Sequence, residues 1–504
     1  MFRIACCGLA AAFAMLAPEP AAAQRWLKAT TPNFVVYSDA PEPYLREYVQ
    51  NLETFDKVIR LMLTMPLDPA KQRLPIYLVR GKAELEVVRP ELPENVAGFY
   101  SASSEGPFAM AIRQGEDDVL LHEYAHHILI GQGNGGQYPA WLNEGLAEYF
   151  MTTSFHAAGR VDVGAANENR ASWVAEGSWL PLSDLFSKRP GEIRDEEHRA
   201  TYYPVAWLVT HYFLSTPERK AQLNRYLSLL GQGGESGSAM ETATGMTLDG
   251  LTRALRTYSR SARQGVRFTN LTPNLEIAIE RLPASADALL LKGLRLKGGY
   301  TEEEEPALLA DIEAQAARFP DDPLALFTLG HAGLHAGDRP GGLTALRRLI
   351  ALHPEHVEGL QFLAMGLMEQ ARDDATPEGA RPELVREARS LLGRAYRAAP
   401  GEFMTLHLLA QTRQGAPDYP TENDLTTWDQ ALQLAPQIGG IRLGYAQALI
   451  RAQEPDEAIA VLTPLANAPH GGPGAAAAKQ MIERARTGGG PASSANETPP
   501  AETD

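Results

Sequence analysis

The chain has 504 residues, which is too long for a single hydrophobic core and enough for two or three domains. Its composition, 44% hydrophobic, 21% charged and 8% aromatic, is typical of globular proteins and excludes collagen, coiled coil and wholesale disorder. The formal net charge of −16 repels phosphate backbones, so we expect no nucleic-acid partner.

The first residues have the pattern of a secretory signal. Arg3 precedes an apolar run that extends to residue 17, and small residues follow it. Because the run is shorter than the ~20 residues of a membrane-spanning helix, we expect cleavage of residues 1–23, export to the periplasm or beyond the cell, and no integral membrane segment afterwards. A lipid anchor on Cys6 is the alternative. Cys6 and Cys7 are the chain's two cysteines, so the exported part would form no disulfide.

The next segment, residues 24–265, has the pattern of an α+β domain. Short apolar runs predict strands at residues 33–37, 74–79 and 108–112. Apolar residues at helical spacing predict a long helix over residues 43–65. Helical patterns dominate the rest of the segment, so that strands come early and helices late.

The segment His122-Glu123-Tyr124-Ala125-His126 has the pattern H-E-x-x-H. Residues four apart share one face of a helix, so both histidines can reach one Zn²⁺ while Glu123 faces the water on the metal. Such a pentapeptide arises by chance in roughly one to two chains per hundred of this length. A third ligand is therefore needed to establish a zinc site.

Glu144 lies eighteen residues beyond His126, after a glycine-rich connection that allows the chain to reverse direction. It would complete a His₂Glu site with water as the fourth ligand. Glu148, one turn later on the same helix face, is the alternative ligand. If Glu144 binds the metal, we expect Glu148 and Asn143 to lie behind the ligands, where Glu148 orients an imidazole.

H-E-x-x-H followed at this distance by W-L-N-E-G-x-A-E-Y resembles the gluzincin metallopeptidases, the group of thermolysin and related aminopeptidases, and above all the bacterial peptidase MA-like proteins. The resemblance is confined to this part of the chain. It implies a zincin-like α+β fold and hydrolysis of a peptide or protein substrate. It also implies one zinc ion per chain, with His122, His126 and Glu144 as its ligands and Glu123 as the general base.

The same resemblance suggests where a substrate would lie. The strand at residues 108–112 shortly precedes the zinc helix, as the substrate-binding edge strand does in gluzincins. We therefore expect Ala109, Met110 and Ala111 to line an extended peptide. Ala111 stands where the aminopeptidases carry a Glu that binds a free amine, which favours an endopeptidase.

Two tyrosines are candidates for the donor that stabilises the oxyanion in such a reaction. In related enzymes a Tyr some distance beyond the Glu ligand has this role, and Tyr202 and Tyr203 lie at a similar distance here. His211 is a poorer option. For all three, packing in the core is the alternative.

From about residue 283 the chain becomes a series of Ala- and Leu-rich helices. These helices end near four prolines, Pro320, Pro354, Pro400 and Pro436. The intervals are 34, 46 and 36 residues, and the first equals the tetratricopeptide period. We therefore predict an all-α superhelix of tetratricopeptide-like repeats at residues 283–486, with an unrelated helical bundle as the alternative. A linker at 266–282 would precede it, and a disordered tail at 487–504 would follow.

Two functions follow from these patterns. The first is an exported zinc-dependent endopeptidase whose repeats recruit a protein substrate or partner. The alternative is a periplasmic binding scaffold with an inactive peptidase-like domain. The presence of all three ligands and the base in the sequence favours the enzyme.

Overall fold

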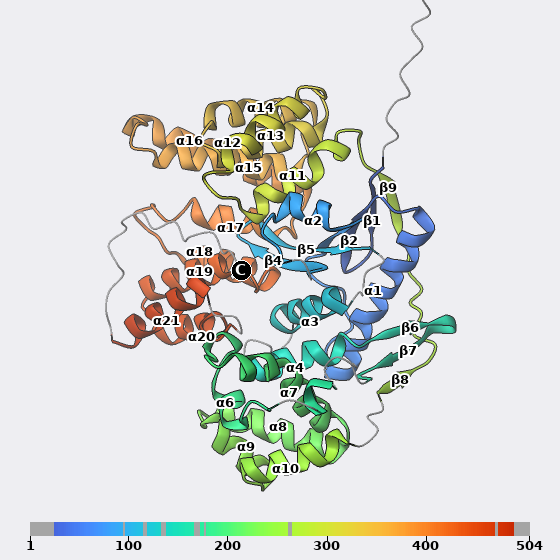
Figure 1. Cartoon of the computed structure of the whole chain (residues 1–504). Helices are drawn as coiled ribbons and strands as arrows, with labels where there is room; N and C mark the ends of the chain where they lie inside the picture. Colours follow the sequence, from blue (N-terminus) through green and yellow to red (C-terminus); the bar gives the residue numbers. More distant parts are fainter. Residues whose placement is uncertain are drawn as a thin grey trace, which may run out of the picture.

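The computed structural model describes residues 25–93, 96–113, 118–132, 138–165, 172–175, 178–260, 265–468 and 472–487. They form a mixed α/β region followed by a large helical region (Figure 1). The expected signal peptide lies outside the described residues, as does all of the expected tail except Thr487. None of the described helices combines the length and the apolar character needed to cross a membrane.

A six-stranded mixed sheet is the frame of the α/β region. Its strands follow the order β4-β5-β3-β2-β1-β9. Their bounds are β1 Leu27–Thr30, β2 Phe34–Ser38, β3 Leu74–Val79, β4 Gly98–Ser103, β5 Gly106–Ile112 and β9 Ala278–Arg281. The β2–β3 and β3–β5 pairs are parallel, and the other pairs are antiparallel. The three predicted strands are confirmed as β2, β3 and β5, whereas β1, β4 and β9 were not predicted.

Helices cover both faces of this sheet. One face packs against α1 (Glu42–Leu63), the predicted long helix, and α3 (Asp118–Gln132). The other face packs against α2 (Lys82–Val88) and the first helix of the helical region. The alternation of β5 follows from this arrangement, because Ala109 and Ala111 belong to the first core and Phe108 and Met110 to the second.

Further helices and a small sheet complete the α/β region and lie below α3 in the view of Figure 1. The helices are α4 Ala140–Phe150, α6 Leu182–Ser187, α7 Glu196–Leu214, α8 Pro217–Gly231, α9 Ser236–Thr244 and α10 Leu248–Ser259. The three-stranded sheet consists of β6 Ser154–His156, β7 Arg160–Val163 and β8 Val266–Phe268. The linker expected at residues 266–282 was wrong, because β8 and β9 lie within it and pair with strands of the α/β region.

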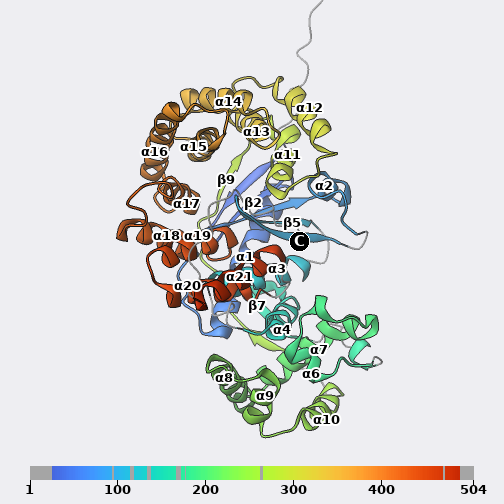
Figure 2. The same cartoon turned by 90° about the vertical axis from the view of Figure 1, so that its left-hand side faces the viewer.

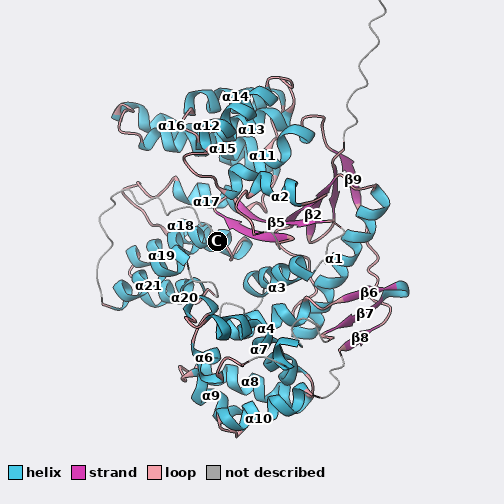
Figure 3. Ribbon diagram, viewed as in Figure 1, coloured by secondary structure: helices cyan, strands magenta, loops and turns pink. Residues whose placement is uncertain are grey.

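The helical region consists of successive packed helices and contains no strand among the described residues (Figure 3). These helices are α11 Ala286–Gly298, α12 Glu305–Ala316, α13 Pro323–His335, α14 Arg339–Leu352, α15 Val357–Arg372, α16 Arg381–Ala398, α17 Phe403–Gln411, α18 Glu422–Leu434, α19 Gly439–Arg451, α20 Pro455–Ala466 and α21 Gly472–Arg486. Helices α13, α15, α17 and α19 begin 34, 46 and 36 residues apart, the same intervals as the prolines. The tetratricopeptide-like repeats are thus confirmed, and the short helix at Glu378–Ala380 lies in the long interval.

The repeats form an arc that contacts the α/β region at both ends (Figure 2). At the start, Arg295 of α11 donates hydrogen bonds of 3.3 Å to the carbonyl oxygens of Val87 and Val88 in α2. At the far end, Arg189 donates a 3.0 Å hydrogen bond to the carbonyl oxygen of Ala466 in α20. The repeats and the α/β region therefore pack together as one molecule.

Candidate metal centre

Helix α3 presents two histidines on the side that faces α4. Its apolar residues, which include Leu121, Ala125 and Ile128, are buried in the core shared with the sheet and α1. His122 and His126 leave the helix on another face, and their Nε2 atoms lie 3.1 Å apart. The packing of α3 thus aims both imidazoles at one point.

Helix α4 brings a carboxylate to the same point. Every residue from Trp141 to Phe150 is buried, so α4 is held on all sides. Oε2 of Glu144 lies 3.6 Å from Nε2 of His122 and 3.3 Å from Nε2 of His126. The residues 133–137, where the chain was expected to reverse, lie outside the described residues.

The distances between these three atoms fit a tetrahedral zinc ion. Zinc bonds to nitrogen and oxygen of about 2.0–2.1 Å place neighbouring ligand atoms about 3.3 Å apart at tetrahedral angles. The three observed separations are 3.1, 3.3 and 3.6 Å. Two imidazole nitrogens and one carboxylate oxygen are also a donor set of catalytic zinc sites, which leave the fourth position open.

The electrostatics of the site keep the Glu144 carboxylate negative beside the two histidine rings. Burial alone would raise the pKa of Glu144, but His126 and His122 hold it well below its usual range. Burial alone would lower the pKa of His122, yet the hydrogen bond to Glu144 and the nearby charge of Glu123 contribute to raising it to about 8. The carboxylate is thus ionised and able to bind a cation.

The two residues expected behind the ligands have different roles. Oε1 of Glu148 lies 3.6 Å from Nδ1 of His122, where it can hold the ring with Nε2 toward Glu144. The two carboxylates therefore face different nitrogens of the His122 ring: Glu144 faces Nε2 and Glu148 faces Nδ1. Asn143 instead donates a 3.2 Å hydrogen bond to the carbonyl oxygen of Tyr138, which fixes the start of α4.

Glu123 is partly exposed on α3 beside the histidines. Its charge is one of the causes that raise the pKa of the adjacent His122 ring. The next histidine, His127, turns away from this site. Its Nδ1 lies 3.1 Å from the Tyr100 hydroxyl on β4, and burial, with the charge of Arg60, lowers its pKa to about 4. His127 therefore packs α3 against the sheet as a neutral ring.

The three candidate oxyanion donors differ in their surroundings. Tyr202 is fully buried, and its hydroxyl donates a 3.1 Å hydrogen bond to the carbonyl oxygen of Lys188. The two nitrogens of His211 lie 2.7 Å from the Tyr258 hydroxyl and 2.9 Å from the carbonyl oxygen of Gly164. Tyr203 is half-buried on α7, with its ring centroid 5.8 Å from that of Tyr202. Helix α7 packs directly against α4, which carries Glu144.

The substrate strand was wrongly predicted. β5 is an inner strand with partners β4 and β3, so its backbone has no free edge to offer a peptide. Ala109, Met110 and Ala111 are at most 5% exposed and belong to the cores on the two faces of the sheet. The edge strand next to α3 is β4, in which two aromatic residues, Phe99 and Tyr100, stand among small ones.

The family described as a protein of unknown function (DUF1570) matches residues 118–232. This stretch begins with α3 and contains the three candidate ligands, Glu123 and both tyrosines. No curated protein matches the chain.

Several solved structures are similar to parts of the chain. A thermophilic TPR protein of Thermus thermophilus is 22% identical, with a TM-score of 0.33 over 40% of this chain and 98% of that one. MamA is 11% identical, with a TM-score of 0.26 over 37% of this chain and 93% of that one. The human IFIT1 dimer with PPP-AAAA is 13% identical, with a TM-score of 0.23 over 59% and 72% of the two chains.

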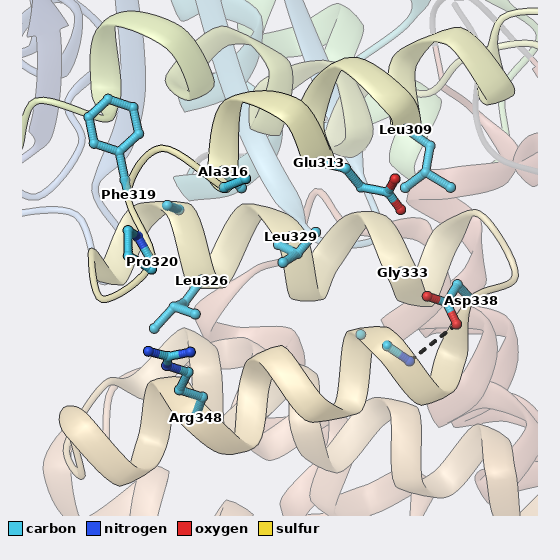
Figure 4. Close-up of a pocket in the computed structure, with 14 residues that line it drawn as sticks. Leu309, Glu313, Ala316, Phe319, Pro320, Leu326, Leu329, Gly333, Asp338 and Arg348 are labelled. Carbon is cyan, nitrogen blue, oxygen red and sulfur yellow. Dashed lines mark hydrogen bonds between the residues drawn. The ribbon is translucent and has the colours of Figure 1, made fainter.

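A separate cavity of about 390 Å³ lies among α12, α13 and α14 (Figure 4). Leu309, Leu326 and Leu329 supply apolar walls, and Arg348 and Asp338 lie at its margins. None of the candidate metal ligands lines this cavity, so it has no part in the site on α3 and α4.

Proposed function

We propose that this protein is an exported zinc-dependent endopeptidase of the zincin type, with helical repeats that bind a protein substrate or partner. The observation that carries the proposal is the convergence of Nε2 of His122, Nε2 of His126 and Oε2 of Glu144 at distances of 3.1–3.6 Å. These residues come from two helices that the sheet core and α7 hold in place.

The residues around the ligands supply the remaining functions of a hydrolase. Zn²⁺ bound by the three ligands would act as a Lewis acid on water and on the scissile carbonyl group. Glu123 takes a proton from the attacking water and returns it to the leaving amine. Glu148 holds the His122 ring, and the Tyr203 hydroxyl donates to the developing oxyanion.

The position of the repeats supports a macromolecular substrate. Their arc starts against α2 and returns to the α/β region beyond α3 (Figure 2). A Cβ atom placed on Gly131, at the end of α3, would lie 3.7 Å from Oε1 of Gln437, just before α19. A polypeptide bound along the repeats would therefore pass close to the zinc helix, and concave repeat surfaces suit such extended ligands.

Zinc content and peptide hydrolysis of the full-length exported protein test the proposal. We expect Glu123→Gln protein to retain zinc and to lose about 10²-fold or more of its activity on an unfolded protein such as reduced casein. His126→Gln protein should lose both the zinc of this site and the activity. Glu303→Gln, at an exposed position in the repeats, is the matched control and should behave as the wild type.

The second candidate function is a binding scaffold with an inactive peptidase-like domain. The helical repeats, which have the form of a protein-binding array, favour it. A wild-type protein without zinc at His122, His126 and Glu144 and without hydrolytic activity would contradict the peptidase and leave the scaffold.

A further inference from the structure

A second pair of histidines has the same helical spacing as His122 and His126. His331 and His335 lie four residues apart on α13, with ring centroids 4.6 Å apart and an interplanar angle of 72°. The corresponding values for the first pair are 4.8 Å and 78°. The helix therefore arranges both pairs in the way that allows two imidazoles to bind one ion.

Glu105, in the turn between β4 and β5, brings a carboxylate to this second pair. Its Oε1 lies 2.6 Å from Nε2 of His335, and its Oε2 lies 3.0 Å from Nε2 of His331. One ligand atom from each residue lies within 4.8 Å of the other two, so a single cation can contact all three. The donor set is the same as that of the first site.

The Glu105 carboxylate is buried, and one of its oxygens has no hydrogen bond. The side chain is only 8% exposed. Oε1 lies within hydrogen-bond distance of both rings. Oε2 lies 3.0 Å from Nε2 of His331 but forms no hydrogen bond with any described residue. A buried oxygen without a hydrogen bond is costly, and a cation between the carboxylate and the rings would satisfy it.

The surroundings hold the His331 ring and leave one side open. The centroids of Phe327 and Phe362 lie 5.8 and 4.7 Å from that of His331. His335 is the most exposed of the three ligands, with 32% of its side chain accessible, which leaves room for water as a further ligand. Lys297 of α11 is near enough for its charge and that of Glu105 to interact, while burial lowers the pKa of the Lys297 amine.

We propose that Glu105, His331 and His335 bind a second divalent transition-metal ion, Zn²⁺ by the chemistry of its ligands. Glu105 and His331 are 226 residues apart in the sequence, so the ion joins the β4–β5 turn of the α/β region to the first repeats. It stabilises the contact between the two regions, because an ion that binds the assembled site favours the folded arrangement. This inference does not depend on peptidase activity.

Zinc binding by full-length His126→Gln protein tests the second site, because this variant lacks a ligand of the first. Metal-free protein is dialysed against micromolar ZnCl₂, and bound zinc is measured by inductively coupled plasma mass spectrometry. We expect one equivalent per chain in His126→Gln protein and none in the His126→Gln/His335→Gln double variant. A His126→Gln protein that retains no zinc overturns the second site.

The single variants separate this proposal from the proposed function. Two equivalents in the wild type, with one lost in His126→Gln and one in His335→Gln, support both sites. A single equivalent that is lost only in His126→Gln leaves the peptidase centre and overturns the second site. A single equivalent that is lost only in His335→Gln supports the second site and contradicts the first.

Two further measurements separate metal binding from an effect on folding. Glu105→Gln keeps an acceptor for the imidazoles but removes the charge, so in the His126→Gln background it should weaken zinc binding about tenfold or more with an unchanged circular dichroism spectrum. Zinc should raise the melting temperature of His126→Gln protein but not that of the double variant. An equal rise in both proteins would place the zinc elsewhere and overturn the proposal.

Discussion

The hydroxyl of Tyr124 donates a 2.6 Å hydrogen bond to Oδ1 of Asp56, which joins α3, the helix of the two candidate histidine ligands, to α1. Asp56 is also paired with Arg60 at 2.7 Å, and all three side chains are buried. Since Tyr124 directly follows Glu123 on α3, this network fixes the rotation of the helix about its axis. It thereby determines that His122 and His126 face α4.

Tyr124→Phe protein should be less stable than the wild type. The substitution removes the donor to Asp56 and leaves the Asp56–Arg60 pair in place, so we expect a loss of about 1–3 kcal/mol in the free energy of unfolding. Urea unfolding followed by circular dichroism measures it. Tyr396→Phe, at a position 41% exposed, is the control and should change stability by less than about 0.5 kcal/mol. Equal stability of the two variants would show that the Tyr124–Asp56 hydrogen bond contributes nothing to stability.

Local patterns in the sequence were sufficient to predict the helices that carry the site. The i, i+4 spacing of His122 and His126 determines their common face, and the position of Glu144 in the sequence was enough to expect it beside them. The sequence could not show the Tyr124–Asp56 contact, because a polar residue on an amphipathic helix is normally exposed. A possible signal was the set of charged residues Glu53, Asp56 and Arg60 at helical spacing on α1, all of which are buried.

The order of the strands required long-range information. β9 pairs with β1 across about half of the chain, and nothing in its four residues predicts that partner. The hairpin of β4 and β5 was not predicted, because the apolar run at residues 108–112 indicates one strand only. The contact between Glu105 and His331 also required long-range information, because only the folded chain brings a hairpin turn and a repeat helix together.

Gly145, directly after Glu144, should tolerate no side chain. A Cβ atom there would meet Oγ1 of Thr210 and lie 2.6 Å from the carbonyl oxygen of Ala206, because α4 and α7 approach closely at this point. We expect Gly145→Ala to cost about 1–3 kcal/mol of stability and to weaken zinc binding by displacing Glu144. Urea unfolding and zinc titration measure the two effects.

Gly393→Ala is the matched control for that substitution. Gly393 lies within α16, and a Cβ atom there would meet nothing closer than Nη1 of Arg397 at 3.7 Å. Alanine has the higher helix propensity, so this variant should gain up to about 1 kcal/mol. If Gly145→Ala were as stable as Gly393→Ala, the packing of α4 on α7 would be less close than described.

Glu148→Gln should weaken zinc binding without abolishing it. Glu148 faces Nδ1 of His122 and not the metal position, so its charge acts on the ligand through the ring. We expect the affinity of Glu148→Gln protein for zinc to be about 10–100-fold lower than that of the parent protein. Glu144→Gln protein should lose most of its zinc binding. Competition with a zinc chelator measures both, in the His335→Gln background so that the second site does not contribute. The reverse order of the two effects would make Glu148 the ligand.

Tyr203→Phe and Tyr202→Phe should separate catalysis from stability. The Tyr202 hydroxyl is bonded to the backbone of Lys188, so its loss should lower stability by about 1 kcal/mol and leave kcat nearly unchanged. Loss of the Tyr203 hydroxyl should lower kcat about 10²-fold with little effect on KM, as expected for a donor to the transition state. An unchanged kcat in Tyr203→Phe protein would remove this residue from the mechanism.

His407 should make the repeats sensitive to acid. It is buried on α17, its Nε2 lies 2.9 Å from Nε2 of Gln411, and burial lowers its pKa to about 4. The unfolded chain binds a proton on His407 near pH 6.5, whereas the folded chain keeps the ring neutral to a lower pH. The contribution of the neutral ring to the free energy of unfolding is therefore complete above pH 6.5 and is lost as the pH falls toward 4. The loss is up to about 3 kcal/mol. His407→Gln cannot be protonated, so its melting temperature should fall less than that of the wild type between pH 7 and pH 4.5. Parallel profiles for the two proteins would show that the His407 ring is already charged, or accessible to solvent, in the native state.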